Sequence, residues 1–186
     1  MDYYSQKFYL PLVDKNDNII GKKERWEIHK KGQLHRGFTT ILIYKNRFVI
    51  QHRKHPAFDD LFDFTFSSHP VYIDEKLQTM EEAIVQTLTR EWNITKNDLK
   101  SKINFLDKIY YRAVDPRSNF IEHEVDYIYF VEINRLPQPN PDFAYGYKLI
   151  STQQFLKLKT KNLELNLAPW VNNILHSKTI LPRLGF

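Results

Sequence analysis

The chain has 186 residues, of which 42% are hydrophobic and 15% aromatic, and its formal net charge is +5 at pH 7. This composition excludes a disordered chain and predicts one globular domain, residues 1–186, with enough chain for a core. The sequence contains no cysteine, which excludes a disulfide framework, a thiolate metal site and a cysteine nucleophile, and which fits a cytoplasmic protein. Imidazole and carboxylate groups must therefore supply any metal ligands.

The net charge and the short length of the apolar runs limit the kinds of partner that the chain can bind. No apolar run is long enough to span a bilayer, so no membrane segment is predicted. The positive net charge favours anionic partners, and the scattered basic residues do not settle whether these are small phosphorylated molecules or nucleic acid. Aromatic and basic residues do not interleave as an RNA-binding platform requires, which argues against nucleic acid.

The first half of the chain is predicted to be mainly strands. Residues 8–13 and 19–21 form a hairpin across the turn DKNDN, and a helix or loop follows at 22–35. Residues 38–53 form a second hairpin, FTTILIYKNRFVIQHR. The segment FDFTFSSHPVY, residues 62–72, then begins as a strand with one buried face, because phenylalanines alternate with polar residues.

The second half mixes helices and strands. Thr79 and Glu82 have the spacing of a capping box, which predicts an amphipathic helix over residues 79–92. The later predictions are a polar loop at 73–78, strands at 103–114 and 122–133, and helices at 151–159 and 169–175. Because strands and helices alternate without strict βαβ order, the expected architecture is an α/β sandwich around a mixed β-sheet.

Several residues of ligand type lie in unusual places. A period of two puts Glu122, Glu124 and Asp126 on the same strand face as apolar residues, which predicts carboxylates at the rim of a cavity; a solvated edge strand is the alternative. Glu91 lies on the buried stripe of its helix, near the C-terminus where the helix dipole disfavours an anion. This suggests a metal ligand, unless the helix frays there. His29 and His35 flank a short loop, so their two imidazoles could reach the same point.

The segments HKKGQLHRGF, SSHP, YYRAVDPRSNFIEHEVDYIYFV and LAPWVNNIL occur in that order. Together they resemble the type I isopentenyl-diphosphate isomerases, a branch of the Nudix superfamily, from about residue 10 to 175. The resemblance implies a Nudix fold, an α/β/α sandwich around a mixed sheet. It also implies an enzyme of isoprenoid biosynthesis that interconverts isopentenyl and dimethylallyl diphosphate by adding one proton and removing another.

The resemblance also implies roles for individual residues. The family's site for a divalent metal matches five residues here: His29, His35, His69, Glu122 and Glu124. Magnesium is the expected metal, with manganese or zinc as alternatives at this His/Glu site, and a magnesium ion that bridges the substrate diphosphate is expected at Glu91. The positions that bind the diphosphate match Arg25 and Arg53, and Lys54 matches a third one loosely. The catalytic set matches Ser67, Glu124, Tyr111 and Trp170.

This chain departs from the family at two informative positions. Ser67 occupies the place of the catalytic cysteine, and a serine hydroxyl is a weaker acid than a thiol. Asn93 replaces the usual glycine near the end of the Nudix helix. Two other functions remain open: a Nudix pyrophosphohydrolase acting on a nucleoside or isoprenyl diphosphate, and a non-catalytic diphosphate binder. A hydrolase needs a second carboxylate near Glu91, for which Glu75 and Glu82 are the candidates.

Overall fold

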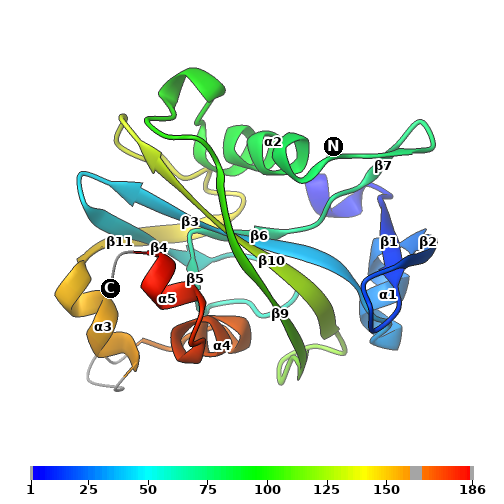
Figure 1. The fold of residues 1–186 in the computed structure, drawn as a ribbon. Helices are drawn as coiled ribbons and strands as arrows, with labels where there is room; N and C mark the ends of the chain where they lie inside the picture. Colours follow the sequence, from blue (N-terminus) through cyan, green and yellow to red (C-terminus); the bar gives the residue numbers. More distant parts are fainter. Residues whose placement is uncertain (1, 160–164, 185–186) are drawn as a thin grey trace.

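The computed structural model describes residues 2–159 and 165–184 (Figure 1). In this part of the chain, nine strands form the main sheet. Helix α2 (Met80–Trp92) covers one face, and helices α3 (Thr152–Lys159), α4 (Pro169–His176) and α5 (Ile180–Arg183) cover the other. The predicted three-layer α/β/α sandwich around a mixed sheet is confirmed.

The remaining elements complete the sheet and its edges. The strands of the main sheet are β1 (Tyr9–Val13), β2 (Ile19–Glu24), β3 (His35–Tyr44), β4 (Arg47–Arg53), β5 (Phe62–Phe64), β6 (Phe66–Ser68), β9 (Asn104–Val114), β10 (Ile121–Ile133) and β11 (Ala144–Ser151). Helix α1 (Arg25–Lys31) links β2 to β3, and a short 3-10 helix, Tyr3–Ser5, precedes β1. The predicted polar loop at 73–78 is instead a small hairpin of β7 (Tyr72–Ile73) and β8 (Lys76–Leu77).

Strand β3 is the centre of the sheet. Strand β10 runs parallel to it along one edge, with Glu124 opposite His35. On the other edge β1, β6 and β4 each pair with a different part of β3, and Ser67 lies opposite Thr39. The start of β3 therefore meets the acidic end of β10 and the end of β6.

The phenylalanine strand differs from its prediction. Thr65 has a positive φ of 33°, which divides the segment into β5, paired with β4, and β6, paired with β3. Asp63 and Thr65 are both 0% exposed, so the prediction of one buried face is wrong. The Thr65 hydroxyl donates to the Val49 carbonyl and accepts from the Leu42 amide, which satisfies it inside the sheet.

Helix α2 begins and ends as its sequence predicts. Thr79 and Glu82 form the capping box. At the other end Asn93 adopts a left-handed conformation with φ 52°, the backbone geometry that favours glycine at this position. Glu91 is buried within the intact last turn, so the helix does not fray there.

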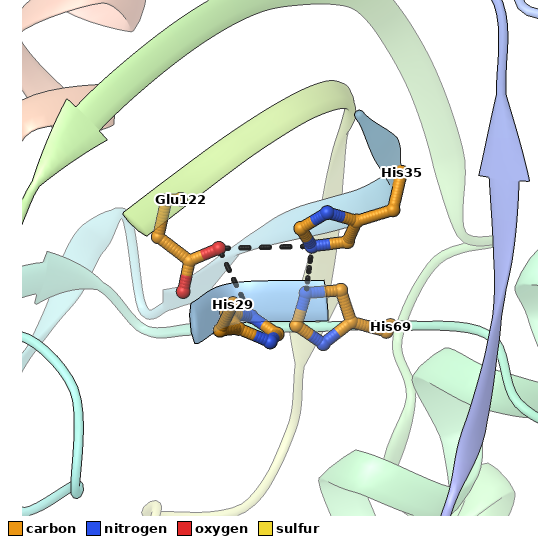
Figure 2. A group of neighbouring side chains, drawn as sticks. All are labelled: His29, His35, His69 and Glu122. Carbon is orange, nitrogen blue, oxygen red and sulfur yellow. Dashed lines mark hydrogen bonds and ion pairs between the residues drawn. The ribbon is translucent and has the colours of Figure 1, made fainter. Parts of the chain in front are cut away.

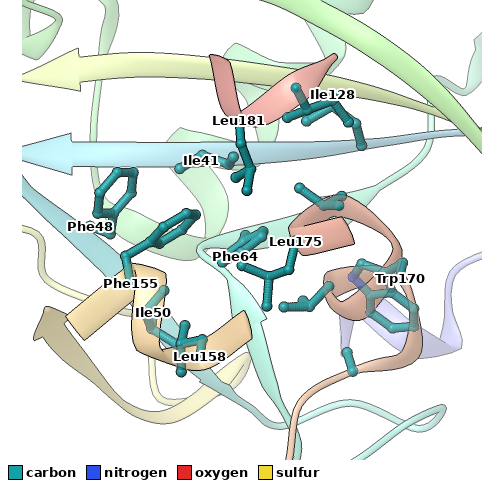
Figure 3. Close-up of a cluster of buried hydrophobic side chains, with 14 of the residues drawn as sticks. Ile41, Phe48, Ile50, Phe64, Ile128, Phe155, Leu158, Trp170, Leu175 and Leu181 are labelled. Carbon is teal, nitrogen blue, oxygen red and sulfur yellow. The ribbon is translucent and has the colours of Figure 1, made fainter. Parts of the chain in front are cut away.

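The sheet has an apolar cluster on each face. The larger one lies between the sheet and α3–α5 (Figure 3), where Phe48 and Phe64 both stack on Phe155 and Trp170 is 1% exposed. The second lies beneath α2, around Leu88 and Trp92. Within the described ranges no helix has the length and apolar character needed to cross a membrane.

Candidate active site

Side chains from four segments converge at the start of β3 (Figure 2). His29 comes from α1, His35 from β3, His69 from the loop that follows β6, and Glu122 from β10. One ligand-type atom of each lies within 4.8 Å of the others. The Nε2 atoms of His35 and His69 are 3.2 Å apart, and His29 Nε2 lies 3.2 Å from Glu122 Oε2.

Backbone carbonyls orient two of these imidazoles. His29 Nδ1 lies 2.6 Å from the carbonyl oxygen of Arg25, and His35 Nδ1 lies 2.8 Å from that of Gln33. A carbonyl oxygen only accepts, so the neutral rings carry their proton on Nδ1. Each Nε2 is then left with a free lone pair that points toward the centre of the group.

Glu124 is the fifth member of this group, the His/Glu cluster. Its Oε1 lies 2.7 Å from His69 Nε2 and 3.3 Å from His35 Nε2, and its Oε2 accepts from the Tyr111 hydroxyl at 2.7 Å. A Cβ at Gly37 would lie 2.5 Å from Glu124 Oε1, so only glycine permits this position. Burial opposes ionisation of Glu124, but its contacts with His35 and His69 outweigh burial and hold its pKa well below the usual range.

The His/Glu cluster fits a divalent cation. Glu122 Oε2 is buried without a hydrogen-bond partner, and His29 Nε2 and His35 Nε2 lie 3.2 Å and 3.7 Å from it. Burial lowers the pKa of His29, but the neighbouring Glu122 outweighs burial and raises it. Three nitrogens and two carboxylates without sulfur form a ligand set typical of manganese, zinc or magnesium proteins.

An arginine cluster, consisting of Arg25, Arg53 and Arg90, lines a cleft with a cavity volume of about 40 Å³. His29, His69, Glu122 and Glu124 of the His/Glu cluster line the same cleft. Arg53 Nη1 donates to Asp63 Oδ2 at 2.9 Å, and Arg90 Nη2 donates to Glu91 Oε1 at 2.8 Å. Asp63 raises the pKa of Arg53 against the effect of burial. The guanidinium groups provide donors suited to the oxygens of a diphosphate.

Two tyrosines near the start of the described chain cover this cluster. The Arg90 guanidinium lies 4.1 Å from the centre of the Tyr3 ring, and Arg25 donates to the carbonyls of Tyr3 and Tyr4. Trp26 Nε1 also donates to the Tyr4 carbonyl at 2.9 Å. The 3-10 helix therefore forms part of the rim of the cleft.

The predicted phosphate-binding residues do not all reach the cleft. Arg25 and Arg53 line it, as does Glu91, whose pKa is raised by burial. The Lys54 ammonium instead donates to the Pro141 carbonyl at 2.9 Å, and Lys54 is not among the residues that line the cleft.

The predicted catalytic residues share the cleft. Ser67, Glu124, Tyr111 and Trp170 all line it, and the rings of Tyr111 and Trp170 have centres 5.8 Å apart. Ser67 Oγ lies 2.8 Å from Thr39 Oγ1. The cleft thus combines a carboxylate, a hydroxyl and two aromatic faces.

Some residues around the cleft have no counterpart in the sequence predictions. Asp63 looked solvent-facing because it alternates with phenylalanines, and the sequence analysis gave Arg90 no role. His55, which also lines the cleft, is half-buried, and desolvation followed by the charge of Arg53 lowers its pKa well below the usual value. No sequence pattern identifies Asp63 as buried, because its partners Arg53 and Trp170 lie on other elements.

The carboxylates that a hydrolase would recruit face elsewhere. Glu82 is exposed and completes the capping box with Thr79. Glu75 lies on the β7–β8 hairpin and pairs with Lys22. Neither lines the cleft that contains Glu91.

Comparisons with known proteins indicate the family and the fold of the chain. No protein-family model matches the chain. Isopentenyl-diphosphate Delta-isomerase 1 of Mesocricetus auratus is 30% identical over 177 residues, which cover 86% of this chain and 77% of the hamster protein. A solved structure from Deinococcus radiodurans covers 90% of this chain and 96% of its own, with a TM-score of 0.67 and 16% identity. A MutT NUDIX hydrolase from Burkholderia pseudomallei covers 79% and 99%, with a TM-score of 0.54 and 18% identity. The two structures show the fold alone.

Proposed function

The chain belongs to the isopentenyl-diphosphate Delta-isomerase family, a branch of the Nudix superfamily, and from this premise we propose that it interconverts isopentenyl and dimethylallyl diphosphate. The observation that carries the proposal is the position of Glu124. One of its oxygens belongs to the His/Glu cluster, and the other accepts from Tyr111, whose ring lies near Trp170. A carboxylate in this place can exchange a proton with an apolar substrate held against the two rings.

The catalytic roles are divided among the residues of the cleft. Glu124 and Ser67 exchange protons with the two reacting carbons, and the Tyr111 hydroxyl stabilises the charge on Glu124. The face of Trp170 stabilises positive charge that develops on the isoprenyl group. The Asp126 and Thr39 side chains, hydrogen-bonded at 2.9 Å, lie behind Ser67 and support it.

A divalent cation is the expected cofactor. His29, His35, His69, Glu122 and Glu124 would hold it, and when bound it would neutralise the charge of the two carboxylates and fix the imidazoles. Magnesium is the first candidate there, with manganese or zinc as alternatives, and Glu91 would hold the magnesium that accompanies the diphosphate. Arg25 and Arg53 bind the diphosphate oxygens, with Arg90 beside them.

Proton NMR of the purified protein with isopentenyl diphosphate and magnesium in deuterated water tests the proposal. Deuterium uptake with appearance of the dimethylallyl isomer is expected. Release of phosphate without isomer formation would overturn the proposal in favour of a pyrophosphohydrolase. Binding of the diphosphate without any reaction would favour a binding protein.

A further inference from the structure

Asn140, in the loop between β10 and β11, binds the end of helix α2. Its backbone N–H donates to the Glu91 carbonyl at 2.7 Å, and its side-chain Nδ2 donates to the Arg90 carbonyl at 3.1 Å. The Asp142 amide donates to Asn140 Oδ1 at 3.0 Å, which fixes the orientation of the side-chain amide. One residue therefore satisfies two of the carbonyls that the last turn of a helix leaves without partners.

The two bound carbonyls belong to residues whose side chains line the cleft. Arg90 Nη2 donates to Glu91 Oε1 at 2.8 Å, so the two side chains lie together. Within the described part of the chain, Arg90 Nε is buried and has no hydrogen-bond partner. This guanidinium therefore keeps a donor for an added acceptor, and a phosphate oxygen is an acceptor that arginine binds well.

Asn140 also holds Phe143, another residue that lines the cleft. The Asn140 carbonyl accepts from the Phe143 amide at 3.0 Å, and the centre of the Phe143 ring lies 5.5 Å from the Arg90 guanidinium. Asn140 thus fixes Arg90 in two ways, through the main chain of the helix and through the aromatic ring that packs on the guanidinium.

The donors of Asn140 also reduce the electrostatic cost of Glu91. This residue is 8% exposed and lies at the C-terminal end of α2, where free carbonyls carry partial negative charge that disfavours a buried carboxylate. The N–H groups of Asn140 place partial positive charge at two of those carbonyls. A carboxylate can then be held at this position, facing the cleft.

We propose that Asn140 is a positioning residue for diphosphate binding: it holds the last turn of α2 so that the Glu91 carboxylate and the Arg90 guanidinium act on the same phosphate group. The inference rests on the proposed function, in which Glu91 holds the magnesium that accompanies the diphosphate. A contact that positions binding groups acts on the ground state and the transition state alike. Its loss should therefore raise KM and leave kcat nearly unchanged.

Calorimetry with inorganic diphosphate and magnesium tests the inference without catalysis. Asn140→Ala removes the side-chain donor, and we expect the Kd for diphosphate to rise about fivefold, the size of effect that one hydrogen bond produces. Steady-state kinetics should show a similar rise in KM for isopentenyl diphosphate. Diphosphate binding as tight as that of the wild type, or a fall in kcat with unchanged KM, would overturn the inference.

The matched control is Asn93→Gly. Asn93 Nδ2 donates to the Gln138 carbonyl at 3.2 Å, so this contact joins the same helix end to the same loop without involving Arg90 or Glu91. Glycine suits the left-handed backbone at this position. Asn93→Gly is expected to bind diphosphate as the wild type does. A loss equal to that of Asn140→Ala would show that any attachment of the loop has this effect, which would overturn the specific role of Asn140.

A second variant keeps the loop turn intact. Asn140→Asp can still accept from the Asp142 amide, but it cannot donate to the Arg90 carbonyl and it adds negative charge near Glu91. We expect it to weaken diphosphate binding at least as much as Asn140→Ala, and it decides the question if Asn140→Ala does not fold; wild-type affinity would overturn the inference. Because diphosphate binding is measured apart from the reaction, a failure to detect isomerisation by NMR would refute only the proposed function.

Discussion

The His/Glu cluster and the arginine cluster lie at the same cleft, but their charges are balanced in different ways. Each partnered arginine already has its own carboxylate: Arg53 pairs with Asp63, and Arg90 pairs with Glu91. In the His/Glu cluster, acceptor atoms face one another and Glu122 Oε2 has no hydrogen-bond partner. These arginines are therefore neutralised by partners within the described chain, whereas we expect an added cation to complete the His/Glu cluster at Glu122.

The two clusters therefore differ in whether their side chains are held in place without a ligand. The arginines can be held in place before substrate arrives, because their partners are part of the fold. His29 and His35 are aligned by backbone carbonyls, and we expect a bound cation to stabilise the His/Glu cluster further. We therefore expect substitutions in the His/Glu cluster to change kcat or cation-dependent stability, and substitutions in the arginine cluster to change mainly KM.

The largest effect is expected at Glu124. Glu124→Gln removes the group that exchanges a proton with substrate, so kcat should fall about 10³-fold, while the fold persists because Gln can still accept from Tyr111. Glu132→Gln, on the same strand β10 and paired at the surface with Lys100, is the control and should retain full activity. Steady-state kinetics and thermal melting measure both; full activity in the Glu124→Gln protein would sink the isomerase assignment.

Cation binding should stabilise the chain through the His/Glu cluster. Manganese at 100 times its Kd is expected to add about 2.7 kcal/mol to the free energy of unfolding, or roughly 5–10 °C in Tm. His69→Ala should lose most of this gain, and His52→Ala, which removes a surface pair with Asp60, should keep it. Calorimetry with and without a chelator checks this. An equal gain in His69→Ala would mean that manganese binds elsewhere.

A smaller effect is expected in the arginine cluster. Arg25→Gln should raise KM for the diphosphate about tenfold and change kcat little, because a phosphate contact binds ground state and transition state alike. Arg112→Gln, an exposed change on β9, is the matched control. A fall in kcat with unchanged KM would show that Arg25 takes part in the chemical step instead.

The smallest effect concerns His55. The unfolded chain protonates this imidazole below about pH 6.5, but burial and Arg53 keep it neutral in the fold. Its contribution to stability is therefore complete above that pH and is lost below it, by about 1.4 kcal/mol per pH unit. His55→Asn, which can still accept from the Ala57 amide, should remove this part of the slope between about pH 6.5 and 5. Denaturant melts at each pH measure the free energy of unfolding of the wild type and of His55→Asn. Identical pH slopes for the two proteins would contradict the neutral state of His55 in the fold.

Strand β10 and the phenylalanine segment show what the sequence could predict. On β10, the period of two places Glu122, Glu124 and Asp126 on a buried face, and the structure has all three buried. The resemblance to the isomerases, confirmed by the relatives, indicated the histidines that join them. These features are local patterns or fixed spacings within short segments.

The same alternation gave the wrong result at Asp63. A polar residue between phenylalanines is assigned to solvent, unless a partner elsewhere in the chain offsets its desolvation cost. Those partners, Arg53 and Trp170, lie on other elements, and the break at Thr65 follows from pairing with two different strands. Sequence pattern contains none of this tertiary information. The roles of the site residues remain predictions.

The pairing of β3 with β10 has a consequence for how the protein is made. His35 and Glu124 belong to different halves of the chain and meet only in this parallel ladder. A chain emerging from the ribosome cannot assemble the His/Glu cluster until β10 has been synthesised, and such long-range parallel pairing closes slowly. Metal capture should thus coincide with the last cooperative step of folding, and manganese-dependent protection in a refolding reaction would report when that ladder closes.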